Sequence, residues 1–126
     1  SLPSLCDWVR NHTPKNSIIF VEDLGNKKPF LNFYEIMTLT MAIKCFGQRA
    51  TFVDPAFPFN ESSLLEWEKR QFYYHNLDLL NKKKMNEIIK KYAITHFLVD
   101  VNRPFELPKS RRVWESEKLA LIEVNI

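Results

Sequence analysis

Residues 82–101 read KKKMNEIIKKYAITHFLVDV, and this stretch decides the fold class. Met85, Ile88, Ile89 and Tyr92 recur at the i, i+3, i+4, i+7 spacing of one apolar helix face. Residues 95–101 (THFLVDV) follow at once, and they are rich in the β-branched and aromatic side chains of buried strands. A helix that leads directly into a buried strand is typical of an α/β fold.

The same alternation continues toward the N-terminus. Apolar residues at helical spacing run from Leu2 to Val9, and Pro14 prevents the helix from continuing. Residues 17–21 (SIIFV) and 50–53 (ATFV) are short apolar runs that predict two further buried strands. We therefore expect three strands that are separated along the chain by helices.

Two more helices are expected between these strands. Residues 30–46 are apolar nearly all round, which indicates a helix buried on several sides, and Gly47 is a natural C′ residue for its end. A second helix is expected at residues 63–75, with Asn60 or Ser62 as its N-cap. On its helical wheel Leu64, Leu65 and Phe72 group together, with Glu68 and His75 among them, whereas Glu66 and Arg70 lie on the opposite side.

Residues 111–114 and 119–124 alternate as the two arms of a hairpin that turns at residues 115–118. The order α-β-α-β-α-α-β-β-β predicts one α/β domain over residues 1–126. Its expected architecture has three layers around a mainly parallel central sheet of about five strands, with a C-terminal antiparallel hairpin.

Composition excludes several function classes. The chain has a mild net charge of +3, and we expect no nucleic acid among its partners. Only two glycines are present, so a glycine-rich phosphate loop is absent. The lysines of residues 82–91 are interpreted as a solvated helix face, with an anionic membrane surface as the alternative partner.

The sequence predicts neither a metal nor a cofactor. His12, His75 and His96 are scattered and form no paired-ligand motif, and His96 is expected to be packed or hydrogen-bonded in its strand. No GxSxG nucleophile motif is present. Cys6 and Cys45 are interpreted as buried free thiols, and a single disulfide is the alternative in an oxidising compartment.

Acidic residues stand at the ends of the expected strands. Asp23 and Asp54 follow the first and second strands, and Asp100 lies near the end of the third. Ligands of open parallel sheets bind beyond these strand ends, so the three acids are candidates for a cation or a polyol. Ordinary turn chemistry explains the same residues and is the favoured interpretation.

Several short segments resemble one protein family. They are residues 7–17 (DWVRNHTPKNS), 48–54 (QRATFVD), 57–59 (FPF) with Glu66, Trp67 and Arg70, and 92–100 (YAITHFLVD). Together they resemble the C-terminal domains of bacterial multi-pass membrane proteins of the integral-membrane, lipid-linked-donor glycosyltransferase type. Ala93 departs from the family pattern, which has glycine there.

The resemblance implies a non-catalytic domain on the periplasmic face of the inner membrane, continuing from a membrane helix that ends just before Leu2. Its partners would be the membrane-embedded remainder of the parent chain, which carries the catalytic acid, and a saccharide or lipid-linked substrate. The site residues that the resemblance indicates are Arg49, Asp54, Glu66, Trp67 and Arg70.

Each of these residues has two physical interpretations. Arg49 and Arg70 suit a phosphate or carboxylate, and Trp67 suits a sugar face. The alternative is a structural network in which Glu66 pairs with Arg70, Arg49 with Asp54, and Trp67 lies in the core.

Two other functions stay open. One is a stand-alone interaction module, in which the helix at residues 30–46 docks a partner; such a module would be cytoplasmic. The other is a small hydrolase or transferase that acts at the strand ends.

Overall fold

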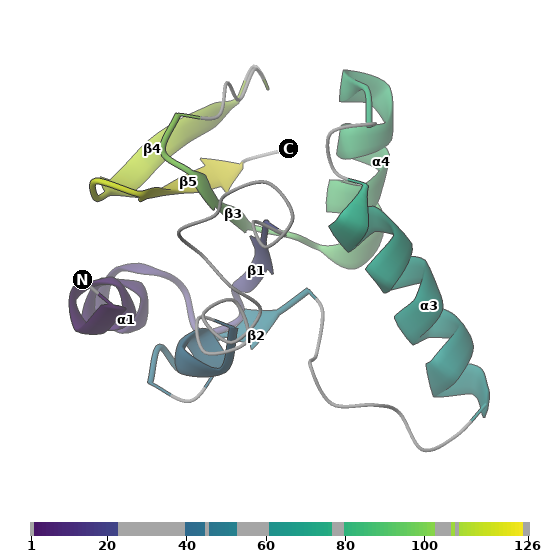
Figure 1. Ribbon diagram of the computed structural model, residues 1–126, viewed down its shortest axis with the longest axis horizontal. Coiled ribbons are helices and arrows are strands. Elements are labelled where there is room, and N and C mark those ends of the chain that lie inside the picture. The colour runs from purple at the N-terminus through teal and green to yellow at the C-terminus, as the bar shows by residue number, and fades with distance from the viewer. Residues whose placement is uncertain are drawn as a thin grey trace.

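The structure is a computed structural model that describes residues 2–22, 40–44, 46–52, 61–76, 80–102, 107 and 109–124. The described elements, in chain order, are α1 (Leu2–His12), β1 (Ile18–Val21), β2 (Ala50–Thr51), α3 (Glu61–His75), α4 (Lys82–Tyr92), β3 (His96–Asp100), β4 (Ser110–Glu115) and β5 (Leu119–Val124) (Figure 1). Residues 40–44 are also helical, and they are the described part of the helix expected at residues 30–46.

The strands form one five-stranded sheet in the order β2-β1-β3-β5-β4. Strand β1 pairs in parallel with both β2 and β3, whereas β5 is antiparallel to β3 and to β4. The α/β class, the five strands and the C-terminal hairpin are thus confirmed. The sheet is mixed: its parallel part is confined to the β2-β1-β3 side, because the hairpin adds β5 directly against β3.

Alternate residues of the central strands belong to two separate cores. Phe20, Phe97 and Ile122 pack with α4 in one cluster, whereas Ile19 and Leu98 pack with α1 in the other. Successive side chains of a strand point to opposite faces, so α1 and α4 cover opposite faces of the sheet (Figure 1). Strand β3 lies between them, and all of its residues are buried.

Helix α3 begins at Glu61, two residues before the expected start, so Ser62 lies inside the helix and is not its cap. The side that faces the protein is also not the apolar one. Leu65 and Phe72 are exposed, whereas Arg70 on the other side contacts the rings of Phe52 and Tyr92. Leu65 and Phe72, two of the apolar residues grouped on the helical wheel, therefore face away from the protein.

Gly47 serves packing and not a left-handed turn. The positive φ in this segment belongs to Gln48, at 56°, and not to the glycine. A Cβ atom at position 47 would lie 2.7 Å from the Ile43 carbonyl oxygen and 3.3 Å from Cγ1 of Val9. Glycine is therefore required mainly because position 47 lies against the Ile43 carbonyl, and the close approach to Val9 of α1 is a secondary constraint.

Both ends of α4 are capped. The Asn81 side chain accepts a hydrogen bond from the Lys84 amide at 2.8 Å, which makes it the N-cap. Ala93 adopts the left-handed conformation at the C-terminal end, with φ 55° and ψ 39°. The amide of Ile94 donates to the Ile89 carbonyl at 3.0 Å, as in helices that normally end in glycine.

Replacing Ala93 with glycine tests this cap. Alanine is disfavoured in the left-handed region, so we expect Ala93→Gly to raise the free energy of unfolding by about 0.5–1 kcal/mol. Lys90→Gly, in the exposed interior of the same helix, is the control and should lower it by about 1 kcal/mol. Urea unfolding followed by circular dichroism measures both, and equal destabilisation by the two glycines would contradict the cap geometry.

Candidate functional site

The parallel strands define two edges of the sheet with different chemistry. We call the side where β1, β2 and β3 begin the amino edge, and the side where they end the carboxyl edge. Residues at the carboxyl edge are the usual ligand-binding groups of open α/β sheets. The polar residues that the sequence singled out divide between the two edges.

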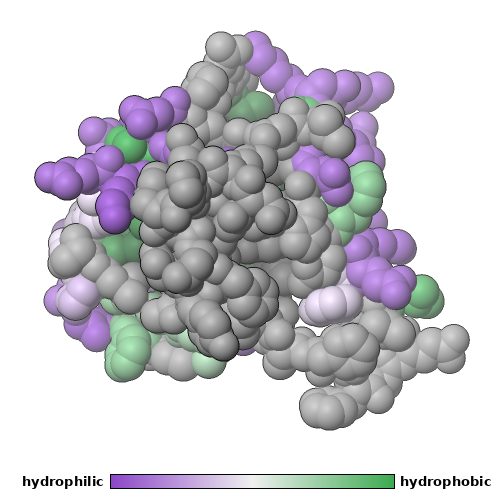
Figure 2. All heavy atoms as spheres, viewed as in Figure 1, coloured by the Kyte–Doolittle hydropathy of each residue, from purple (hydrophilic) through white to green (hydrophobic). Residues whose placement is uncertain are grey.

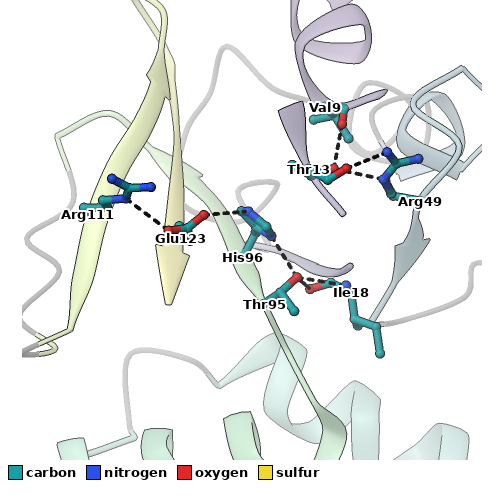
Figure 3. Close-up of polar contacts among 8 residues, drawn as sticks. All are labelled: Val9, Thr13, Ile18, Arg49, Thr95, His96, Arg111 and Glu123. Carbon is teal, nitrogen blue, oxygen red and sulfur yellow. Dashed lines mark hydrogen bonds and ion pairs between the residues drawn. The ribbon is translucent and has the colours of Figure 1, made fainter. Parts of the chain in front are cut away.

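Arg49 lies at the amino edge, just before β2, and its side chain is bonded on all sides to protein oxygens (Figure 3). Its Nε donates to Thr13 Oγ1 at 2.9 Å, and its Nη2 donates to the carbonyls of Arg10 and Thr13 at 2.8 and 2.7 Å. Its Nη1 donates to the Gln48 carbonyl at 2.9 Å and to that of Gly47 at 3.5 Å. These bonds use every N–H group of the guanidinium.

The sequence explains why an arginine is needed there. Pro14 has no N–H group, so it cannot donate to the Arg10 carbonyl in the last turn of α1. Arg49 supplies the missing donor and places its positive charge at the negative end of the helix dipole. Arg49 is 7% exposed, and with every donor occupied it is a structural clamp between α1 and β2 and not an anion ligand.

Substituting Arg49 tests the clamp. Lysine keeps the charge but cannot replace the fork of donors, so Arg49→Lys leaves buried carbonyls unsatisfied and should cost about 2–4 kcal/mol of unfolding free energy. Arg10→Gln is the control, because it removes an exposed ion pair with Asp7 and should cost less than about 1 kcal/mol. Chemical denaturation measures both values. A loss for Arg49→Lys no larger than that for Arg10→Gln would contradict the structural role.

A second polar network crosses the sheet at the same edge (Figure 3). Thr95 Oγ1 accepts from the Ile18 amide at 3.0 Å and lies 2.8 Å from His96 Nδ1. The other imidazole nitrogen, Nε2, is 3.9 Å from Oε2 of Glu123, whose Oε1 accepts from Arg111 Nε at 3.0 Å. The network joins β1, β3, β5 and β4, and it confirms the expectation of a packed, hydrogen-bonded His96.

The order hydroxyl, imidazole, carboxylate is that of a nucleophile relay, but the geometry favours a structural role. Thr95 Oγ1 is already bonded to both the amide and the carbonyl of Ile18, so its oxygen is held by β1. His96 is 2% exposed, which leaves a substrate no access to the imidazole. The network therefore pins the start of β1 to β3.

Burial lowers the pKa of His96, and the nearby Glu123 carboxylate opposes this effect only in part. The folded state favours the neutral imidazole. At pH values below the ordinary histidine pKa of 6.5, the folded state therefore binds fewer protons than the unfolded chain. His96 therefore leaves stability unchanged above that pH and lowers it progressively as the pH falls below it.

His96→Gln tests this linkage. We expect the wild-type free energy of unfolding to fall as the pH is lowered below 6.5, with a slope of at most about 1.4 kcal/mol per pH unit from this one group. The substitution should remove that component, whereas His12→Gln, on the exposed end of α1, should keep it. Denaturant midpoints across this pH range give the slopes, and parallel wild-type and His96→Gln curves would contradict the assignment.

Two buried acids, Glu22 and Asp100, stand at the carboxyl edge, and of these the sequence predicted Asp100. Glu22 Oε2 accepts from the Asp100 amide at 3.0 Å, and Asp100 Oδ1 accepts from the Asn102 amide at 2.8 Å. Asp100 thus makes the turn expected of a strand-end aspartate. The sequence did not predict the role of Glu22, because that role depends on the pairing of β1 with β3, which brings residues 22 and 100 together.

Arg70 is the candidate binding group at this edge. Its Nε donates to Glu66 Oε1 at 3.1 Å, as the i, i+4 spacing predicted, and its Nη1 donates to the Phe52 carbonyl at 2.8 Å, where β2 ends. The guanidinium carbon lies 5.1 Å from the centre of the Phe52 ring and 4.8 Å from that of Tyr92. Such contacts with aromatic faces hold an arginine in one orientation.

Unlike Arg49, Arg70 keeps some bonding capacity. Its side chain is 33% exposed, and within the described part of the chain its Nη2 has no acceptor. The hydroxyl of Tyr92 is buried without a hydrogen-bond partner among the residues described. Trp67, on the same helix, is half-buried. An oriented arginine with one free edge can bind a phosphate or carboxylate.

Several expected site residues lie outside the described residues: Asp23, Asp54 and Cys45. Cys6 is a buried free thiol whose pKa is raised mainly by burial, so it stays protonated and unreactive. Across the described ranges, no group of three histidine, cysteine, aspartate or glutamate residues is placed to hold a metal ion. In the same ranges, no helix has the length and apolar character needed to cross a bilayer.

Comparisons with known protein families, with curated proteins and with solved structures found no match to this chain.

Proposed function

We propose that this chain is a non-catalytic α/β domain of a larger, glycosyltransferase-like membrane protein, and that it binds the phosphate of a saccharide-bearing substrate at Arg70. The observation that carries the proposal is the contrast between two arginines. Every N–H group of Arg49 is bonded to protein, whereas Arg70 is oriented by two aromatic rings, is 33% exposed, and has no acceptor for Nη2 among the described residues. Trp67 would stack on the saccharide, and Glu66 would hold Arg70 in place.

The absence of catalysis is supported by how the reactive groups are bonded. Thr95 is held by the backbone of β1, and His96 is enclosed in the sheet. The carboxylates of Glu22 and Asp100 each accept a hydrogen bond from a backbone amide at the carboxyl edge. These contacts fit a domain that positions a substrate, with the chemical step carried out elsewhere in the parent.

In this proposal the domain stands on the periplasmic face of the inner membrane, next to the membrane-embedded part of its parent. We also propose the full three-layer arrangement, with α1 and residues 40–44 on one side of the sheet and α3 and α4 on the other. The coding sequence upstream of Ser1 tests the parentage, and a reading frame there without several apolar segments of about 20 residues would overturn it.

A titration with a phosphate ester tests the binding site. We expect glucose 1-phosphate and an isoprenyl monophosphate to shift the NMR signals of the Arg70 Nε–H group and of the amides near Trp67. Arg70→Gln should weaken this binding about tenfold or more, because a charge-assisted arginine contact contributes about 1.5–3 kcal/mol. Arg70→Lys should retain part of it through its charge.

The matched control is Arg10→Gln. Arg10 also pairs with an acid one turn away on an exposed helix surface, at 2.7 Å from Asp7, but it makes no cation–π contact within the described residues. This variant should bind phosphate esters as the wild type does. Equal affinity of wild type and Arg70→Gln, with α3 still folded by circular dichroism, would reject the site and leave the parentage to be decided by the upstream sequence.

An interaction module is the second candidate, and one observation favours it. Four large apolar side chains are exposed in the described part of the chain: Met41 (45%), Phe46 (68%), Leu65 (58%) and Phe72 (59%). A partner that covers them would gain apolar burial. This function predicts concentration-dependent association, and a monomer at every concentration in analytical ultracentrifugation would count against self-association.

A further inference from the structure

The α3–α4 side of the molecule combines excess positive charge with exposed apolar side chains. Helix α4 contains five lysines and one glutamate in its sequence KKKMNEIIKKY. Lys82, Lys83, Lys90 and Lys91 are exposed, and Lys84 is half-buried. The whole chain has a net charge of only +3, so this one helix carries more positive charge than the molecule as a whole.

Two basic residues of the hairpin lie next to acids. On β4, Arg111 pairs with Glu123 at 3.0 Å and Arg112 lies 3.4 Å from Glu115. On α4, Lys84 lies 3.5 Å from Glu87, which is the single acid of that helix. By its own sequence α4 therefore carries five lysines against one glutamate.

The adjoining face of α3 adds two large apolar side chains, with the exposed Glu68 between them. Leu65 and Phe72 lie two turns apart on one side of α3 and are both more than half exposed. Tyr73 connects this face to α4, because its ring lies 5.7 Å from that of Phe72 and 5.6 Å from Lys84 Nζ. Figure 2 shows hydrophobic surface next to hydrophilic side chains on this side of the molecule, where Figure 1 places α3 and α4.

We infer that this side docks onto an anionic lipid surface. Lysines beside leucine and phenylalanine are the composition of helices that lie in membrane interfaces, where the lysines attract lipid phosphates and the apolar side chains enter the acyl boundary. A nucleic acid would use the lysines but would leave Leu65 and Phe72 in water. A protein partner that covers the apolar side chains would not require the five lysines of α4. This inference does not depend on the substrate proposed for Arg70.

Vesicle binding by the 126-residue chain tests the inference. We expect the chain to sediment with vesicles of phosphatidylcholine and phosphatidylglycerol, and not with phosphatidylcholine alone. Binding should weaken steeply as salt is added, because screening shortens the reach of the lysines. Salt-resistant binding, or equal binding to both kinds of vesicle, would overturn the role of the lysines.

Two pairs of variants locate the surface. Lys83→Glu with Lys90→Glu should lower the vesicle partition coefficient at least about tenfold. Lys109→Glu with Lys118→Glu makes the same change in net charge on the hairpin side and should lower it far less. Leu65→Ser with Phe72→Ser should also weaken binding, whereas Met41→Ser with Phe46→Ser, which removes exposed apolar side chains elsewhere, should not.

The outcomes separate the possible partners. Equal losses for the two lysine pairs would show that net charge alone drives binding and would reject the α3–α4 surface. Tighter binding to duplex DNA than to anionic vesicles, unaffected by Leu65→Ser with Phe72→Ser, would indicate a nucleic-acid surface instead. Circular dichroism and thermal melting of each variant separate loss of binding from loss of folding.

Discussion

The contact on which the rest of the structure depends is the burial of the Arg49 guanidinium against the end of α1. Pro14 ends that helix and deprives the Arg10 carbonyl of a donor, and Arg49 provides one from a position 39 residues away. A buried charge is tolerated only when hydrogen bonds replace its water, and here five of them do so. The bonds fix where β2 begins, so α1 and the edge of the sheet are ordered together.

The polar groups at the two edges of the sheet differ in how fully the protein bonds them. At the amino edge, Arg49 is fully bonded and the Thr95 hydroxyl is held by the backbone of β1, so these groups hold the sheet together. At the carboxyl edge, Arg70 is bonded through Nε and Nη1 and rests on two rings. The two arginines thus differ in how many of their N–H groups the described residues occupy, and the proposed binding role of Arg70 depends on that difference.

Much of the fold could be predicted from the sequence, because its elements follow local patterns. The stripe from Met85 to Tyr92 gave α4, and the apolar runs gave β1, β3 and the hairpin within one or two residues at each end. The site was less accessible, because it depends on contacts between distant segments. Neither the bonding of Arg49 to α1 nor the pairing of Glu22 with Asp100 has a local signature. The orientation of α3 could not be predicted from its own sequence for the same reason, because the rings that contact Arg70 belong to the end of β2 and to α4.

The orientation of α3 leaves apolar side chains exposed to solvent. A helix normally buries its most apolar side, and α3 instead turns Arg70 and Tyr73 toward the core. None of its side chains in the described part is fully buried, so the cation–π contacts and the Arg70 bond to the Phe52 carbonyl contribute much of its attachment. An arginine that anchors the helix on one side leaves Leu65 and Phe72 exposed on the other. Removing Arg70 would therefore affect both the proposed phosphate site and the proposed lipid-docking surface, whereas Leu65→Ser with Phe72→Ser would affect only the latter. Substitutions on the apolar side of α3 can therefore separate the two proposed functions, whereas a substitution of Arg70 cannot.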